Sequence, residues 1–444
     1  MHYPDGHVLL RSLSREYPTI AYGKGVYLFD TTGTRYFDGS GGAMVNSIGH
    51  GNEEVAARIG EQLARVGYVN GMHFTSQPTE ELATRLCANA PPGLDRAFFL
   101  SSGSEAIEAA VKFVRQLWVE RAQPERSVFI ARSPGYHGNT LFALSASARP
   151  HYKKFFGPLL ADVVMIEAPY EYRSAVADYA RDGGEYYALQ LEQAILKAGP
   201  DKVAAFICEP VIGSSAGGSV PPPGYFERVQ TICRKHGVLI VADEVLCGAG
   251  RTGPFYASAG FGLEPDLLVM GKGLNSGYAP LSAVLVRDAH VREMKAGSGG
   301  FMHAQTYLQA PCMTAAGLAV VDYIEKNHVL DNARARGEQL QRLLREKLLP
   351  LPHVGWVSGT GMLAGVEFVE NKATKSPYPR SRKLAEAFVQ HCFNNGLILW
   401  PNVGQAGGDG DLVMVAPALT ITAAQVEELV TLIASTISSF MGTL

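Results

Sequence analysis

The sequence lacks the features of membrane and secreted proteins. No apolar run approaches the roughly 18 residues that a membrane-spanning helix requires, and the N-terminus has neither the apolar stretch nor the cleavage site of a signal peptide. The six cysteines form no C-x-x-C pair, which argues against a zinc site and against a disulfide framework. We therefore expect a cytoplasmic protein with free thiols and no membrane partner.

Neither sign of charge dominates the chain. Lysine and arginine together number 39 against 42 aspartates and glutamates, and the formal net charge is −3, so no overall attraction to nucleic acid is expected. The 12 histidines are scattered, and the sequence contains no P-loop and no H-E-x-x-H motif. We expect no nucleic-acid partner and no metal site.

What the chain does have is the length and composition of a large globular protein. Its 444 residues are 47% apolar and 18% charged, which is enough for two structural domains. In the middle of the chain, short apolar runs alternate with amphipathic segments, which predicts an α/β fold with a mainly parallel sheet covered on both faces. The expected strands are 96–102, 127–133, 163–169, 203–210, 238–245, 265–272 and 281–287, and the expected helices are 104–120 and 221–237.

The two ends of the chain predict a second, smaller α+β domain. The expected elements are a hairpin at 23–42, a charged helix after residue 330, a strand at 362–369, a glycine-rich loop at 402–411 and a closing helix from about 423. We assign residues 1–60 and 329–444 to this small domain and residues 61–328 to the large domain.

Several residues capable of chemistry fall where the predicted strands end. Ser101 to Glu105, Glu209, Asp243 and Lys272 each lie at or just after an apolar run. Ligands of open α/β sheets bind outside the carboxyl ends of the strands. Residues that are distant in sequence are therefore expected to converge on one crevice.

Lys272 stands between two glycines at the end of the apolar run "LLVMGKG". Desolvation lowers the pKa of a lysine, and the free amine then forms an imine with a carbonyl compound. The flanking glycines would let another molecule approach the backbone closely. The alternative is an ordinary surface lysine in a glycine-rich turn, which the preceding apolar run disfavours.

Three further features fit the same crevice, and each has an ordinary alternative. Asp243 would keep a ring nitrogen protonated, or it would cap a helix or pair with Arg251. The stretch "SSGSEAIEAA" would hold a phosphate at a helix N-terminus, or Ser102 or Ser104 would be a plain N-cap. Tyr136, in "SPGYHGNT", would stack on a flat ring, or it would pack on the core as a loop aromatic.

A phosphate cradle, an aromatic residue, a carboxylate and an imine-forming lysine make up the set that pyridoxal 5′-phosphate (PLP) requires. The stretches that carry this set include "FFLSSGSEAIEAAVKFVRQ", "SPGYHGNT", "LIVADEVLCGAGRTG", "DLLVMGKGLNSGYAPLSAV" and "HAQTYLQAP". In this order and spacing, from about residue 20 to about 430, the chain resembles the class III (ω-type) aminotransferases of PLP fold type I. Within that family it looks most like the amine:pyruvate and β-alanine or taurine:pyruvate branch.

The resemblance implies a seven-stranded type of sheet in the large domain, PLP as the cofactor, and a homodimer or larger assembly with a shared active site. Lys272 would bind PLP as a Schiff base and then move a proton, and Asp243 would pair with the pyridine nitrogen. The other implied cofactor contacts are Gly103 and Ser104 at the phosphate, Tyr136 and Val245 on the two ring faces, His137, Glu209 near the ring substituents or the loop beside them, and Thr306 at the phosphate of the neighbouring subunit. The implied substrate pocket comprises Tyr22, Met44, Phe74 and Trp400.

Three positions depart from the family pattern. Trp400 and Val415 stand where many members carry an arginine, and Met44 stands where amine-type members often carry tryptophan. The pocket is therefore expected to be roomier and more apolar, with Met44 as core filler the alternative. The sequence names no other arginine for a substrate carboxylate.

The expected activity is a ping-pong transfer of an amino group from an amine or ω-amino acid to a keto acid, with pyruvate as the expected acceptor. The same fold also supports PLP-dependent racemases, aminomutases and decarboxylases, which would transfer no amino group to pyruvate. A non-catalytic PLP-binding sensor is the third alternative, but such proteins usually add a DNA-binding segment that this sequence does not show.

Overall fold

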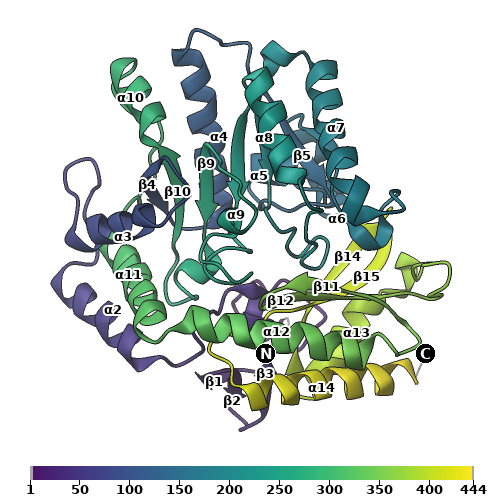
Figure 1. The fold of residues 1–444 in the computed structure, drawn as a ribbon. Coiled ribbons are helices and arrows are strands. Elements are labelled where there is room, and N and C mark those ends of the chain that lie inside the picture. The colour runs from purple at the N-terminus through teal and green to yellow at the C-terminus, as the bar shows by residue number, and fades with distance from the viewer. Residues whose placement is uncertain (1–3, 443–444) are drawn as a thin grey trace.

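A seven-stranded sheet organises the larger part of the molecule (Figure 1). The computed structural model describes residues 4–442, and the predicted α/β fold with a large, mainly parallel sheet is confirmed. The strand order is β4-β10-β9-β8-β7-β5-β6, and only β10 runs antiparallel to its neighbours. The strands are β4 (Leu94–Leu100), β5 (Val128–Ser133), β6 (Val164–Glu167), β7 (Val203–Cys208), β8 (Leu239–Asp243), β9 (Leu267–Met270) and β10 (Ser282–Arg287).

Helices cover both faces of this sheet, as the continuous apolar strands predicted. In β7, whose six residues are all buried, Ala205 and Ile207 face one core, while Phe206 and Cys208 face the other. The first face is covered by α4 (Gly103–Glu120), α5 (Leu141–Ala146) and α10 (Asp288–Ala296). The second face is covered by α3 (Gln77–Ala88), α7 (Tyr179–Ala198), α8 (Tyr225–His236) and α11 (Pro311–Lys326).

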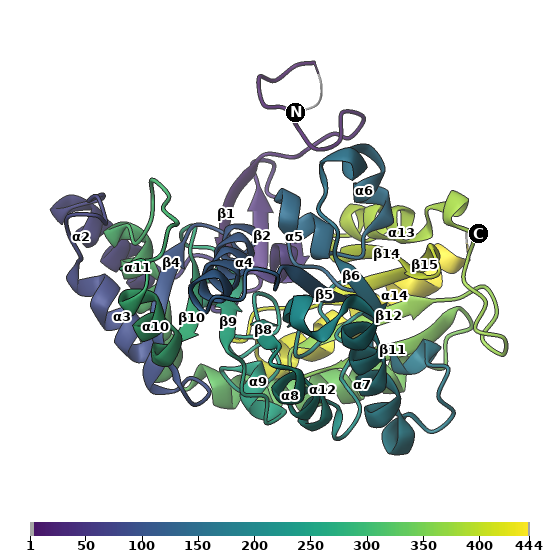
Figure 2. The ribbon, with the colours of Figure 1, turned by 90° about the horizontal axis from the view of Figure 1, so that it is seen from above.

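The two ends of the chain meet in the smaller part of the molecule. Strand β13 (Leu397–Ile398), from the C-terminal end, pairs in parallel with β3 (Arg35–Asp38), from the N-terminal end. Helix α2 (Glu53–Arg65) packs on α11 and contributes Val55 to the core cluster that contains Phe37 of β3; in Figure 2 it lies near α3 and α11. The domain boundaries near residues 60 and 328 stay predictions.

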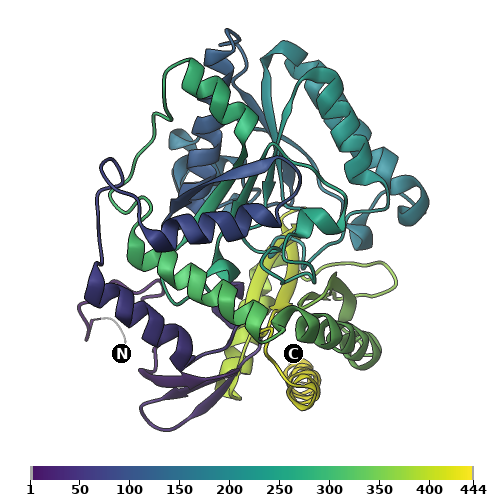
Figure 3. The ribbon, with the colours of Figure 1, turned by 60° about the vertical axis from the view of Figure 1, so that its left-hand side comes forward.

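The smaller part contains two four-stranded sheets and three long helices. Helices α12 and α14 pack on each other at its outer side (Figure 3). The remaining elements are β1 (Ile20–Lys24), β2 (Tyr27–Asp30), α1 (Gly41–Met44), α6 (Pro150–Phe156), α9 (Ala257–Gly260), α12 (Val329–Leu348), β11 (Val354–Thr360), β12 (Leu363–Phe368), α13 (Leu384–Asn394), β14 (Trp400–Ala406), β15 (Asp409–Val415) and α14 (Ala423–Met441). In the described part of the chain, no helix is long and apolar enough to cross a membrane.

The expectation of a loop at 402–411 is wrong. Most of this segment belongs to an antiparallel hairpin of β14 and β15, which completes the sheet β11-β12-β15-β14. The glycines at 404, 407, 408 and 410 have positive φ angles between 65° and 106°. They form the bulge and the turn of the hairpin rather than an irregular loop, because glycine adopts such angles without steric cost.

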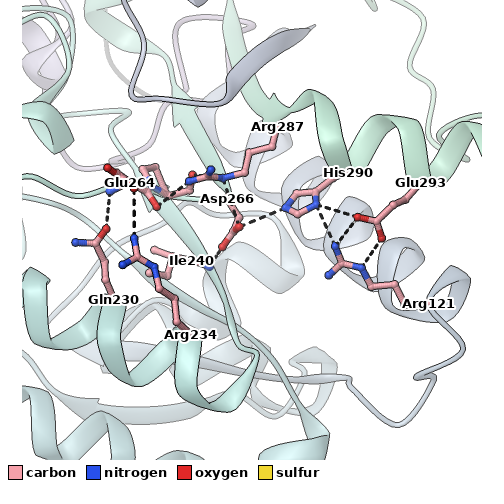
Figure 4. Close-up of polar contacts among 10 residues, drawn as sticks. Arg121, Gln230, Arg234, Ile240, Glu264, Asp266, Arg287, His290 and Glu293 are labelled. Carbon is pink, nitrogen blue, oxygen red and sulfur yellow. Dashed lines mark hydrogen bonds and ion pairs between the residues drawn. The ribbon is translucent and has the colours of Figure 1, made fainter.

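A polar network lies at the end of the large sheet opposite the ends of β8 and β9 (Figure 4). Asp266, just before β9, accepts the Ile240 N–H at 2.9 Å and lies 3.3 Å from Nε2 of His290. Arg121, just after α4, donates two hydrogen bonds of 2.6 and 2.8 Å to Glu293 of α10. This network ties helices to the sheet and is remote from the strand ends where a ligand would bind.

Candidate active site

Lys272 lies just beyond the end of β9, in a short 3-10 turn (Lys272–Leu274). Its φ angle is +43°, a left-handed conformation that usually costs a non-glycine residue about 1–2 kcal/mol. The Lys272 carbonyl accepts the N–H of Ser276 at 3.0 Å, which fixes this turn. Lys272 therefore lies at the C-terminal end of β9, in a strained backbone conformation that the surrounding turn maintains.

The environment of Lys272 favours the neutral amine. The side chain is partly buried, and within residues 4–442 its amine makes no hydrogen bond or ion pair. Desolvation lowers the pKa of Lys272 to about 8; Asp243 and Glu209 oppose this shift, and Arg251 and Arg149 add to it. Although the residue keeps some solvent contact, the burial of its amine dominates. A lysine of this kind is a nucleophile near neutral pH.

Asp243 ends β8 and is paired with His137. Oδ2 of Asp243 lies 2.7 Å from Nδ1 of His137, and Oδ1 accepts the Val245 N–H at 3.0 Å. Both side chains of the pair are buried, so the histidine provides the polar partner that a buried carboxylate requires. The alternative pairing with Arg251 is not formed, because that guanidinium donates to the backbone carbonyls of Asn46, Met362 and Pro417.

Glu209 follows β7 and fixes the turn that carries Tyr136. Its carboxylate accepts the Tyr136 N–H at 3.1 Å and the Gly213 N–H at 2.7 Å. Burial raises the pKa of Glu209, while these two backbone hydrogen bonds lower it. Glu209 thus holds the backbone of the turn that carries Tyr136.

The start of α4 is both a capped helix and an open anion site. The Ser102 hydroxyl accepts the Glu105 N–H at 3.3 Å, so the ordinary capping role is present. The N–H groups of Gly103 and Ser104 donate to no group in the described chain, and such N–H groups attract phosphate. A Cβ atom at residue 103 would lie 2.7 Å from Cγ1 of Val245, so only glycine fits between the helix start and that side chain.

The structure does not bring all predicted residues together. Tyr22 is 59% exposed and stacks on Phe29, Phe74 is 65% exposed, and Thr306 is exposed in a turn. Within residues 4–442, none of Tyr22, Phe74 and Thr306 makes a hydrogen bond or ring contact with the residues around Lys272. These three residues reach a site only if a second subunit brings them there.

Met44 and Trp400 lie in one apolar cluster. Met44 is buried and packs with Val211, Leu246 and Met414, and Trp400 is partly buried against the same cluster. Met44 therefore has the surroundings that the core-filler alternative predicted. Trp400 gives this cluster an aromatic wall at the start of β14.

Sequence analysis did not single out Arg149, which lies between Tyr136 and the hairpin β14–β15. Its guanidinium carbon is 5.3 Å from the ring centroid of Tyr136. It donates to Oδ1 of Asn402 and, at 2.9 Å, to Oγ of Ser214. No motif marks the residue, because both partners come from distant parts of the chain.

These residues fit PLP. The glycine at the start of α4 leaves free N–H groups for a phosphate, and Asp243 presents a buried carboxylate for a ring nitrogen. Lys272 supplies an amine without a partner, in keeping with covalent attachment of an aldehyde. The fold and the site together define a PLP-dependent enzyme.

Comparison with known proteins identifies the family. Residues 13–437 match the family "Aminotransferase class-III". The uncharacterized aminotransferase YodT of Bacillus subtilis is 37% identical, covering 98% of both chains, and the putrescine–pyruvate aminotransferase of Pseudomonas aeruginosa is 34% identical, covering 93% of this chain and 89% of the relative. A solved (S)-enantioselective ω-transaminase from Thermomicrobium roseum superposes with a TM-score of 0.92 at 35% identity, covering 99% of this chain and 96% of the other. The chain belongs to the class III aminotransferases, which are PLP-dependent transaminases.

Proposed function

We propose that this transaminase moves an amino group from an amine to pyruvate, with PLP attached to Lys272. The observation that carries the proposal is the partnerless Lys272 amine, with a pKa of about 8, in the electrostatic field of Asp243. Pyruvate as the acceptor is supported by the name of the Pseudomonas aeruginosa relative, and an amine donor by the ω-transaminase from Thermomicrobium roseum. Both substrates are small molecules.

Each residue of the site has a role that its geometry supports. When bound, PLP supplies an electron sink that stabilises negative charge on the substrate carbon. Lys272 holds the cofactor and, once released, its neutral amine takes a proton from the substrate carbon and returns it. Asp243, oriented by His137 at 2.7 Å, keeps the ring nitrogen protonated.

The remaining residues bind and orient the cofactor. The free N–H groups of Gly103 and Ser104 hold the phosphate at the start of α4. Tyr136 would cover one face of the ring and Val245 the other, and Glu209 accepts the Tyr136 N–H at 3.1 Å and so holds that backbone in place.

We further propose a cytoplasmic homodimer in which Thr306 binds the phosphate of the partner's cofactor. Large apolar side chains near this residue are exposed, with Met72 at 83%, Met302 at 73% and Tyr307 at 58%. An exposed apolar group of this size is typical of an interface between subunits. All six cysteines are free, which agrees with a reducing compartment.

Chemical trapping tests the assignment of Lys272. We expect borohydride reduction of the holoenzyme to fix the cofactor on Lys272, as seen by peptide mass spectrometry. Lys272→Ala should lose turnover while still binding some PLP, whereas Lys24→Ala, at an exposed strand edge, should retain turnover. A normally active Lys272→Ala variant would refute the assignment.

A half-reaction assay tests the transfer itself. An amine without a carboxylate, such as 1-phenylethylamine, should change the cofactor absorbance in the absence of an acceptor, and pyruvate should restore it while alanine is formed. Conversion of substrate without alanine would instead indicate a racemase, an aminomutase or a decarboxylase.

A further inference from the structure

Arg149 is a buried cation that lacks a counter-ion. The residue is 7% exposed, and within residues 4–442 no carboxylate lies within ion-pair distance of it. Its hydrogen-bond partners are two neutral side chains, the amide of Asn402 and the hydroxyl of Ser214, and its Nε–H has no partner at all. A buried charge with unused donors is costly unless an anion joins it.

The other buried arginines near the sheet, Arg126, Arg132 and Arg251, have no unpartnered buried nitrogen within the described residues; Arg132 donates to the Glu209 carbonyl. Arg251 donates three hydrogen bonds to backbone carbonyls, and Arg126 donates to three backbone carbonyls and to Oε1 of Gln123. Fixed backbone oxygens account for their burial, whereas nothing comparable accounts for the burial of Arg149.

The position of Arg149 points to the substrate. The guanidinium stacks over Tyr136, and its partner Ser214 follows Gly213, whose N–H is held by Glu209. Its other partner, Asn402, is two residues after Trp400 in β14, so both side chains project from the same face of the strand. Arg149 therefore reaches the strand face where Trp400 stands. Its charge also acts on Lys272 and helps to lower the pKa of that residue.

We propose that Arg149 binds the carboxylate of the keto-acid acceptor and so makes the enzyme prefer carboxylate-bearing acceptors over simple aldehydes. The Nε side of a guanidinium presents two parallel N–H groups that match a carboxylate, and this is the side on which Arg149 has an unpartnered nitrogen. Asn402 and Ser214 hold the other parts of the group. The inference rests on the proposed function, since it concerns the acceptor of that reaction.

The test compares two acceptors of three carbons, pyruvate and propanal, in the holoenzyme and in Arg149→Gln. We expect the variant to lose roughly 10- to 100-fold in kcat/KM for pyruvate, mainly through KM, because a hydrogen-bonded charge pair is lost. Propanal should change by less than about 3-fold, since it has no carboxylate to bind. Arg149→Lys keeps the positive charge but loses the two parallel N–H groups, so its kcat/KM for pyruvate should lie between those of the wild type and Arg149→Gln. Arg11→Gln, on the exposed arginine that donates to Tyr152, is the matched control and should leave both acceptors unchanged.

A binding measurement separates this inference from the proposed function. Propionate, an unreactive carboxylate, should raise the Tm of the wild-type holoenzyme and fail to raise that of Arg149→Gln. Equal losses for pyruvate and propanal, an unchanged pyruvate KM, or an unchanged propionate shift would each overturn the role of Arg149. If Arg149→Gln does not fold, an Arg149→Lys protein with unaltered pyruvate KM overturns it equally. If the wild type transfers no amino group to either acceptor, the proposed function fails, while the propionate shift still decides whether Arg149 binds carboxylates.

Discussion

At the scale of single residues, the chemistry of Lys272 is set by its neighbours rather than by its own type. Two carboxylates, Asp243 and Glu209, would raise the pKa of its amine, yet desolvation outweighs them and the pKa falls to about 8. Neither carboxylate is hydrogen-bonded to Lys272: Asp243 is paired with His137, and Glu209 accepts hydrogen bonds from backbone N–H groups. The Lys272 amine therefore stays free to act as a base, although the carboxylates of Asp243 and Glu209 act on it electrostatically.

The lowered pKa predicts the order in which lysines react. Since Lys272 loses its proton as the pH rises through about 8, while an ordinary lysine stays charged up to about 10.5, its amine is the more reactive one at pH 8. Limited reductive methylation of the apoenzyme at pH 8, followed by peptide mass spectrometry, should modify Lys272 ahead of exposed lysines such as Lys24. Modification of both at the same rate, with a midpoint near pH 10.5, would contradict the lowered pKa.

The pair of His137 and Asp243 predicts an effect on stability. His137→Leu leaves a buried carboxylate without its side-chain partner and should lower the free energy of unfolding by about 3 kcal/mol, as measured by urea titration. In His137→Asn the amide nitrogen can take the place of Nδ1, so most of that loss should be recovered. Equal stability of the two variants would mean that the 2.7 Å contact contributes little.

The sequence predicted part of this site and could not predict the rest. Lys272 and Asp243 could be predicted because each ends an apolar strand, and the rule that ligands bind at the carboxyl ends of strands in open α/β sheets predicts that they lie close together. Arg149 could not be predicted from the sequence, because its partners Ser214 and Asn402 are 65 and 253 residues away. The partner of His137 is 106 residues away. Only the folded chain shows that His137 has a carboxylate partner and that Arg149 has none within residues 4–442.

At the scale of secondary structure, prediction succeeded where burial is uniform. Every residue of β7, β8 and β9 is buried, and the expected ranges of all seven strands of the large sheet agree with the observed ones to within a few residues. It failed at β14–β15, because glycines suggested a loop although Asn402 and Asp411 within that segment are buried in the sheet. The pairing of β15 with β12 decides the structure there, and no local signal encodes it.

A contact between two glycines holds the loop that carries Ser214 against the smaller part. A Cβ atom at Gly365 in β12 would lie 2.3 Å from Cα of Gly217. Gly365→Ala should therefore push the loop away, cost about 2–3 kcal/mol of stability, and reduce transaminase activity through the displaced Ser214. In Gly60→Ala, on α2, the new Cβ meets no atom within 4 Å and should raise stability by up to about 1 kcal/mol. Urea titration and steady-state assays measure both variants; an active and stable Gly365→Ala protein would show that the loop does not depend on this contact.

At the scale of the whole molecule, some of the predicted active-site contacts are not formed within the described subunit. Thr306, Tyr22 and Phe74 are exposed and do not touch the residues around Lys272. The rings of Tyr68 and Tyr307 meet at 6.0 Å beside the exposed Met72, which gives this region the apolar character of a subunit interface. A two-fold dimer would place the same surface of each subunit against its partner, and it would deliver Thr306 to the other active site.

Subunit mixing tests whether the site is shared. Lys272→Ala removes the attachment residue, and Thr306→Asp places a negative charge where a phosphate is expected, so each homodimer should be inactive. If Thr306 serves the partner's site, a mixed dimer contains one site with an intact Lys272 and an intact Thr306. Random mixing of equal amounts makes half of the dimers mixed, and about one quarter of the wild-type activity should return. If Thr306 serves the site of its own subunit, every mixed dimer has one site without the lysine and one with the aspartate, and activity stays at the level of the separate variants.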